Sequence, residues 1–362
     1  MMAFVMKACI AAGNLDRTEY WLKRIEERYE MTNLLSDFPS HHVYNPFVAG
    51  LKNMKDISDR KKAKRSMEIL SKIRPPESME MYKLASKRQV YLNIMKYQEL
   101  GYNGSAAFLR IEKVFRELQK NYRSTENFSM LKPTAEALTP VFRAASKYYV
   151  PHDQTAVVVE KANALFDEFD QLYKETNDTD FCPNREICFS LVSIYARMNR
   201  QKVNLIDFEE RTTLLLERME DYKVEFLNPR LKTAALNRVL VAAEIQLPKI
   251  PMSDPLKTRE VFVTALNTFK KFHDIDARVK VSPNASTYQI FLKACGKLPE
   301  GDTRFKLAAK AFQLCQSNDF VTVETILELH KANPEHAISV LKSTNYLGFK
   351  KENFPPELRL DD

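Results

Sequence analysis

The sequence predicts an all-α protein built from repeated helical hairpins, and three observations lead to this fold class. Apolar residues recur at helical spacing between the prolines, while strand-like alternation is scarce. The 362 residues include only 7 glycines, too few for a glycine-rich parallel α/β protein, and 17 prolines, mostly at boundaries between helical segments. One arrangement of proline and apolar residues also recurs along most of the chain.

The clearest copy of this arrangement lies at residues 281–315. Pro283 ends the preceding segment, and Asn284 and Ser286 can cap the helix that follows. The apolar face of that helix is Tyr288, Phe291, Leu292 and Cys295. The turn residues are Gly296, Pro299 and Gly301. The apolar face of the second helix is Phe305, Ala308, Ala309, Phe312 and Cys315.

The same opening, a proline followed five residues later by an apolar residue, occurs at five earlier places. These openings are Pro39, Pro76, Pro133, Pro183 and Pro229. A seventh copy without its start spans Val5 to Cys9. After Pro76 we expect helices at Met81 to Leu100 and Ser105 to Tyr122. In the first hairpin, Asp16 is the expected cap of the second helix.

Repetition at roughly 35 to 50 residues is typical of a solenoid, in which no hairpin buries its apolar face alone. We therefore predict an α-solenoid of about seven helix-turn-helix repeats over residues 1–316. Residues 317–362 depart from the pattern. We predict that they form a C-terminal helical cap, with helices at Val321 to Lys331 and Glu335 to Lys342, followed by a polar tail.

These residues resemble the pentatricopeptide repeat family. The segment PNASTYQIFLKACG at 283–296 resembles the family's first helix, and AAKAFQLC at 308–315 resembles its second. The resemblance covers most of residues 1–316 and is degenerate around 76–130. It implies a right-handed superhelix of helix pairs, a location in the mitochondrion or plastid, and single-stranded RNA as the ligand of the concave surface. The chain shows no targeting segment, and its truncated first hairpin suggests a longer native N-terminus.

Positive charge is concentrated in one part of the chain. The formal net charge is +8, and residues 52–96 alone contain thirteen Lys or Arg against five Asp or Glu. The candidate RNA-binding residues are Arg60, Lys61, Lys62, Lys64, Arg65, Lys72, Lys83, Lys87 and Arg88. Tyr82, Tyr91 and Tyr97 lie nearby in the sequence and could stack on bases. The plain alternative is a solvated helix face, and a ribosome-embedded subunit would show the same charge.

The resemblance also implies which residues read bases: the fifth residue of each first helix, together with the residue after the proline. The fifth positions are Asn45, Tyr82, Thr139, Phe189, Ala235 and Gln289. A base edge requires a small amide or hydroxyl, so the candidates are Asn45, Thr139, Gln289, Asn184 and Asn284. Most repeats depart from this requirement, and we predict that a contiguous one-base-per-repeat code is absent. These positions are otherwise ordinary solvent-facing residues.

No motif predicts an enzyme, a cofactor, a metal or a small-molecule substrate. Cys182 and Cys188 are six residues apart, which is not a zinc-site spacing, and the same holds for His330 and His336. Five scattered cysteines are typical of a reducing compartment. No apolar run approaches the roughly 18 residues of a membrane span.

Two functions from different classes remain. The first is a non-catalytic organellar RNA-binding protein that holds the RNA backbone through the basic segment. The second is a structural or assembly subunit of a large complex, such as a mitochondrial ribosome, with the repeats as a protein-binding scaffold. The concentrated charge favours the first, and the degenerate base-reading positions favour the second.

Overall fold

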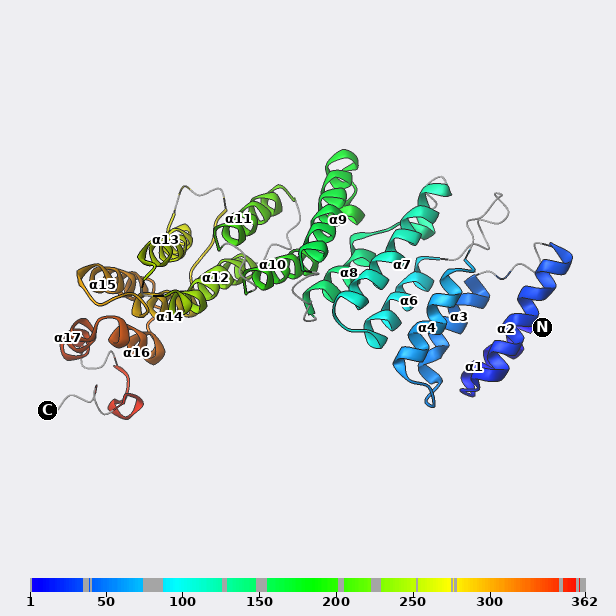
Figure 1. Cartoon of the computed structure of the whole chain (residues 1–362), viewed down its shortest axis with the longest axis horizontal. Helices are drawn as coiled ribbons and strands as arrows, with labels where there is room; N and C mark the ends of the chain where they lie inside the picture. Colours follow the sequence, from blue (N-terminus) through cyan, green and yellow to red (C-terminus); the bar gives the residue numbers. More distant parts are fainter. Residues whose placement is uncertain are drawn as a thin grey trace. The chain divides into compact units, whose positions relative to one another are not determined.

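The computed structural model describes residues 2–34, 39, 41–73, 87–125, 129–147, 155–200, 205–222, 229–251, 253–274, 276, 279–344, 348–355 and 358. Over these residues the chain forms sixteen α-helices with short 3₁₀ turns and no strand (Figure 1). The all-α prediction is confirmed. The chain divides into two compact units, Met1–Leu191 and Val192–Asp362. Helix α10 (Arg185–Arg200) contains the boundary.

The first unit alternates helices that pack as successive neighbours. Its helices are α1 (Met2–Ala11), α2 (Leu15–Thr32), α3 (His41–Gly50), α4 (Asp59–Leu70), α6 (Arg88–Gly101), α7 (Gly104–Ser124), α8 (Ala135–Lys147) and α9 (Thr155–Thr176). Among the first helices of the pairs, α1 packs against α3, α3 against α6, and α6 against α8. The second helix of one pair also packs on the first helix of the following pair, as α4 does on α6 and α7 on α8.

The second unit is built in the same way. Its helices are α11 (Leu205–Asp221), α12 (Pro229–Gln246), α13 (Pro255–Lys271), α14 (Ala285–Gly296), α15 (Asp302–Ser317), α16 (Val323–Ala332) and α17 (Pro334–Thr344). Helix α14 packs on α12 and α16, while α13 and α15 pack on the first helix of their own pair and of the next.

The first helix of each hairpin contributes one stripe of mostly apolar side chains to the core. In α14 the predicted face, Tyr288, Phe291, Leu292 and Cys295, is fully buried. The corresponding buried sets are Tyr44, Phe47, Val48 and Leu51; Tyr91, Ile94, Met95 and Gln98; Leu138, Val141, Phe142 and Ala145; Leu236, Val239, Leu240 and Ala243. Burying each large apolar side chain stabilises the fold by about 1.5–3 kcal/mol. Because the stripe recurs in these helices, it can be used to align them and to identify equivalent residues.

A tyrosine–asparagine hydrogen bond closes two of the hairpins; it is buried in the first and partly buried in the second. Asn121 Nδ2 of α7 donates to Tyr91 Oη at 2.5 Å, and Asn318 Nδ2, after α15, donates to Tyr288 Oη at 3.1 Å. Both pairs are 30 residues apart. Burial raises the pKa of Tyr288 to about 12. The repeated bond makes Tyr91 the equivalent of Tyr288.

That equivalence corrects the expected helix boundaries. Helix α6 begins at Arg88 rather than Met81; residues 81–86 lie outside the described part of the chain. Helix α7 begins at Gly104, with Asn103 rather than Ser105 at its N-cap position. In the first hairpin the cap of α2 is Asn14, whose Oδ1 accepts from the Arg17 amide at 3.0 Å, instead of Asp16.

The last described hairpin repeats the construction of the one before it. A reciprocal capping box opens α14 with Asn284 and Thr287, and another opens α16 with Thr322 and Thr325. Pro334 is the first residue of α17, as predicted from its position. Helices α16 and α17 lie within residues 317–362, which the sequence assigned to a C-terminal helical cap, and they pack on each other.

Candidate nucleic-acid interface

Helix α4 carries most of the predicted basic patch, and its sequence explains its orientation. Ser58 caps the helix, accepting from the Lys61 amide at 3.3 Å, and Asp59 in the first turn suits the positive end of the helix dipole. Ala63, Ser66, Ile69 and Leu70 are buried. Because these residues form one stripe, the basic residues between them are directed away from the core.

Two of the predicted cations are already engaged with carboxylates. Arg65 Nε lies 3.0 Å from Glu19 of α2, and its Nη1 lies 2.8 Å from Glu68. The hydrogen bond to Glu68 raises the pKa of the Arg65 guanidinium. Lys72 Nζ lies 2.5 Å from Glu26, also on α2. The acidic face of α2 therefore neutralises one side of α4.

The remaining predicted cations differ in accessibility. Lys62 has a side chain only 13% exposed, 3.8 Å from Asp59. Arg88 Nη1 donates to the Lys132 carbonyl at 3.3 Å, Lys87 is half-buried before α6, and Lys83 lies outside the described residues. The last three are Arg60, Lys61 and Lys64, which are exposed. Within the described part of the chain, no carboxylate forms an ion pair with any of them.

Sequence reasoning missed the partner of Arg60. Tyr102, just after α6, lies under two guanidinium groups: that of Arg110 is 4.0 Å from the ring centroid and that of Arg60 is 5.8 Å from it. By contrast, the expectation that Tyr91 and Tyr97 stack on bases is wrong, because both rings are buried in the core. Tyr82 lies outside the described residues. The helical period alone could have separated buried from exposed tyrosines, but only the packing of α6 on α4 shows which cations Tyr102 meets.

Two base-reading candidates contact each other. Asn184 Nδ2 donates to Thr139 Oγ1 at 2.8 Å, joining α8 to the start of α10. The Thr139 hydroxyl also donates to the Ala135 carbonyl at 3.0 Å, and Asn184 Oδ1 accepts from the Ile187 amide at 3.0 Å. Thr139 is only 5% exposed. A base edge would have to displace these bonds to reach either side chain.

The other candidates are similarly occupied or only partly accessible. Asn45 Oδ1 accepts from Asn93 Nδ2 of α6 at 2.9 Å. Asn284 Oδ1 caps α14 by accepting from the Thr287 amide at 3.0 Å. Gln289 is half-buried.

Aligning the first helices on their buried stripes changes two of the fifth positions that were assigned from the sequence. In α6, the residue equivalent to Gln289 of α14 is Leu92 rather than Tyr82. In α12 it belongs to Asn237, because the buried stripe of this helix begins at Leu236, and Ala235 is buried. Asn237 Nδ2 lies 3.4 Å from Asn284 Oδ1, repeating the contact between Thr139 and Asn184 two hairpins later.

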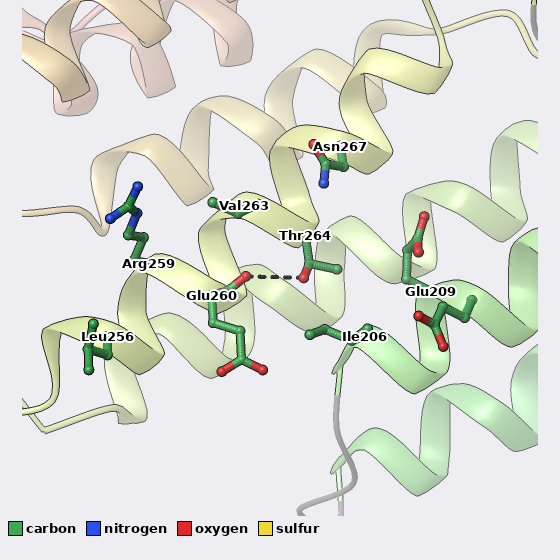
Figure 2. Close-up of a pocket in the computed structure, with 9 residues that line it drawn as sticks. Ile206, Glu209, Leu256, Arg259, Glu260, Val263, Thr264 and Asn267 are labelled. Carbon is green, nitrogen blue, oxygen red and sulfur yellow. Dashed lines mark hydrogen bonds between the residues drawn. The ribbon is translucent and has the colours of Figure 1, made fainter.

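A second surface feature is a groove between α11 and α13 in the second unit (Figure 2). It has a volume of about 560 Å³. Its lining residues are Ile206, Glu209, Glu210, Leu256, Arg259, Glu260, Val263, Thr264 and Asn267. Leu256 is 78% exposed and Val263 is 42% exposed. Lys271 bonds Glu209 and donates to Thr213 Oγ1 at 2.7 Å, holding the two helices together at one end. The lining thus combines apolar side chains with three glutamates and one arginine.

The described residues include no group of three or more His, Cys, Asp and Glu side chains placed to hold a metal ion. Cys182, Cys188, Cys295 and Cys315 are buried, and burial raises the pKa of the Cys295 thiol to about 12 and that of Cys315 to about 11. These thiols remain protonated at neutral pH. No described helix is both long and apolar enough to span a bilayer.

Comparisons with family models, curated proteins and solved structures return no match to this chain. The likeness to pentatricopeptide repeats therefore rests on the residues themselves.

Proposed function

We propose that the chain is a non-catalytic RNA-binding protein of the pentatricopeptide type, acting in a mitochondrion or plastid. Its hairpins stack into a right-handed α-solenoid that ends in a helical cap. RNA is held by its backbone rather than through a contiguous base-reading code. Single-stranded RNA and ribosomal RNA both present this backbone.

The observation that carries the proposal is the exposed side of α4. Arg60, Lys61 and Lys64 project from a capped helix, and no described carboxylate pairs with them. Exposed cations without carboxylate partners release counterions from a nucleic-acid backbone on binding. The ion pairs of Arg65 and Lys72 with α2 limit the interface to this side of the helix.

The state of the base-reading candidates supports backbone binding. Thr139 and Asn237 are buried, while Asn184 and Asn284 serve as helix caps. Each therefore has a structural role that a base would have to disrupt, and desolvated polar groups are costly to leave unpaired.

The test is binding of a randomised single-stranded RNA pool over a series of salt concentrations. We expect affinity to fall steeply with salt, without enrichment of any sequence. In Lys61→Gln/Lys64→Gln the slope of log affinity against log salt should be shallower by about 1.4, since each phosphate contact contributes about 0.7 for single strands. Lys306→Gln/Lys310→Gln removes the same charge from exposed positions on α15 and is the control.

Three results would contradict the proposal. Absence of binding at low salt would remove RNA as a ligand. Equal losses in the α4 variant and the α15 control would remove α4 as the interface. Strong enrichment of one sequence would show that bases are read.

A second function, a scaffold that binds protein subunits of a larger complex, is favoured by the groove between α11 and α13. Leu256 and Val263 expose apolar surface in a groove that is also lined by Glu210 and Glu260, a surface suited to a basic amphipathic helix. Under this proposal, Leu256→Asp/Val263→Asp loses a stoichiometric partner that co-purifies with the wild type, while RNA affinity is unchanged. If the same partner is retained by the variant, the groove is not its docking site.

A further inference from the structure

We infer that Arg60, Tyr102 and Arg110 form a clamp for one phosphodiester of the bound RNA. This inference rests on the proposed RNA-binding function and deepens it by naming a contact that the basic segment 52–96 does not contain. Tyr102 and Arg110 lie beyond that segment, and they meet Arg60 only because α6 returns the chain to the start of α4.

Glycine at position 101 makes this meeting possible. A Cβ atom there would lie 2.6 Å from Ala63 Cβ, 2.8 Å from the Asp59 carbonyl oxygen and 3.1 Å from Arg60 Cα. Two of these three atoms are backbone and cannot rotate away. The end of α6 therefore rests directly on the first turn of α4, and Tyr102, the next residue, lies beside Arg60.

The charges at this junction differ from those at neighbouring ones. Between α2 and α4, Arg65 meets Glu19; between α7 and α9, Lys161 meets Glu112 at 2.7 Å. Between α4 and α7, two arginines approach one tyrosine ring instead.

No described carboxylate forms an ion pair with Arg60 or Arg110. The acid nearest to Arg60 in sequence, Asp59, lies 3.8 Å from Lys62, and the acid nearest to Arg110, Glu112, pairs with Lys161. Both guanidinium groups lie within 5.8 Å of one ring centroid, so the junction concentrates positive charge that attracts an anion.

A phosphodiester fits the chemistry of this arrangement. Its two non-bridging oxygens can each accept from one planar guanidinium fork, the geometry in which arginine binds phosphate best. The tyrosine ring attracts both cations and holds them in place before the ligand arrives. Lys64, one turn along α4 from Arg60, and Lys113, three residues after Arg110, are exposed and extend the positive surface on each side.

The experiment compares variants of the full chain with a short single-stranded RNA of mixed sequence, over the same salt series. Arg60→Gln/Arg110→Gln should lose about tenfold in affinity, with a slope shallower by about 0.7, the value for one phosphate. Arg17→Gln/Arg24→Gln removes two exposed arginines of α2 and should keep the wild-type slope. Tyr102→Phe, which keeps the ring, should bind like the wild type, whereas Tyr102→Leu should bind more weakly. Circular dichroism and melting establish that each variant is folded.

The outcomes separate the clamp from the proposed function. If the wild type binds RNA and the Arg60/Arg110 variant matches its control, the clamp is overturned and the RNA-binding proposal stands. If the wild type does not bind, both are overturned. Polyphosphate replaces RNA in a further arm. Equal, clamp-dependent affinity for polyphosphate would show that the site takes any phosphate chain, which overturns the assignment to RNA.

Discussion

Tyr91 and Tyr288 occupy equivalent positions in two hairpins, yet the asparagines that donate to their hydroxyls differ in their other hydrogen bonds. Asn318 Nδ2 also donates to the Leu314 carbonyl at 2.7 Å, so it keeps a partner when the tyrosine hydroxyl is removed. Asn121 is buried, and its one described side-chain hydrogen bond is to Tyr91. Because an unsatisfied buried amide is expensive, the two tyrosines should respond differently to the same substitution.

We expect Tyr91→Phe to lower the free energy of unfolding by about 1–3 kcal/mol and Tyr288→Phe by about 0.5–1.5 kcal/mol. Urea denaturation of both variants and the wild type measures the difference. Equal losses would show that Asn121 finds another partner.

His273 is the residue whose protonation should alter stability. Its ring packs 5.0 Å from Phe269 and 5.8 Å from Tyr288 between centroids, and its buried Nε2 has no hydrogen-bond partner among the residues that the structure describes. Burial lowers the pKa of His273 below its ordinary value. The unfolded chain therefore binds a proton more readily than the folded chain, and stability falls as the pH drops through about 6.5 toward the lower folded pKa.

His273→Phe should remove this contribution while filling the same space. Denaturation at pH 7.5 and pH 5.5 should show a smaller loss of stability on acidification in the variant than in the wild type. If both lose the same free energy, His273 does not titrate differently in the folded state.

At the scale of the helix, Asn284 has two competing assignments, a cap and a base reader. As a cap, its side-chain oxygen accepts from the Thr287 amide, and Thr287 Oγ1 accepts from the Asn284 amide at 3.1 Å. Serine can replace asparagine in the first of these bonds but offers no amide to a base. The two roles are therefore separable.

Asn284→Ala should cost about 0.5–2 kcal/mol of stability, and Asn284→Ser only a few tenths. Chemical denaturation measures both, and RNA binding of the folded variants should equal that of the wild type. A variant that is stable but binds RNA more weakly would restore Asn284 as a base contact.

Two glycines at the ends of first helices form a matched pair. At Gly101 an added Cβ meets backbone atoms of α4 within 3.1 Å, whereas at Gly296 its nearest neighbour is 3.9 Å away. Gly101→Ala should destabilise by about 1–3 kcal/mol through overpacking. Gly296→Ala should be neutral or stabilising, because alanine loses less entropy in a helix than glycine. Equal melting temperatures for the two variants would contradict the close approach of α6 and α4.

For the whole molecule, packing between successive helices predicts that damage remains local. Phe312 is fully buried in α15. Phe312→Asp places a charge without a partner in this core, at a cost of several kcal/mol. In an array stabilised by neighbour contacts, the hairpins next to α15 should lose structure while distant hairpins keep it.

Hydrogen exchange measures this directly. We expect protection to be lost in α14–α17 of Phe312→Asp and retained in α1–α4. Wild-type protection throughout would show that Phe312 is not part of the packing. Loss of protection in every helix would show that the whole chain unfolds as one cooperative unit.

The sequence by itself determined the helical class, the buried stripe of α14 and the cap at Asn284. These depend on local rules: the 3.6-residue period, the side chains that accept from free amides, and the fixed backbone angle of proline. It also located the positive charge on the segment that contains α4. The start of α6 could not be predicted from the position of Pro76, because the residues on either side of this start have similar helix propensity. The buried stripe around Tyr91 is decided by contacts of α6 with α3 and α4.

Only the tertiary structure decided which charges and amides are accessible. Arg65 and Lys72 differ from Lys61 and Lys64 because α2 places glutamates beside the first two, more than 40 residues away in sequence. Likewise, the contact between Thr139 and Asn184 depends on how neighbouring hairpins are aligned. The meeting of Arg60, Tyr102 and Arg110 depends on a close helix crossing that a single glycine permits. Local periodicity gives the face of a helix, but the partner on that face is set by packing between distant segments.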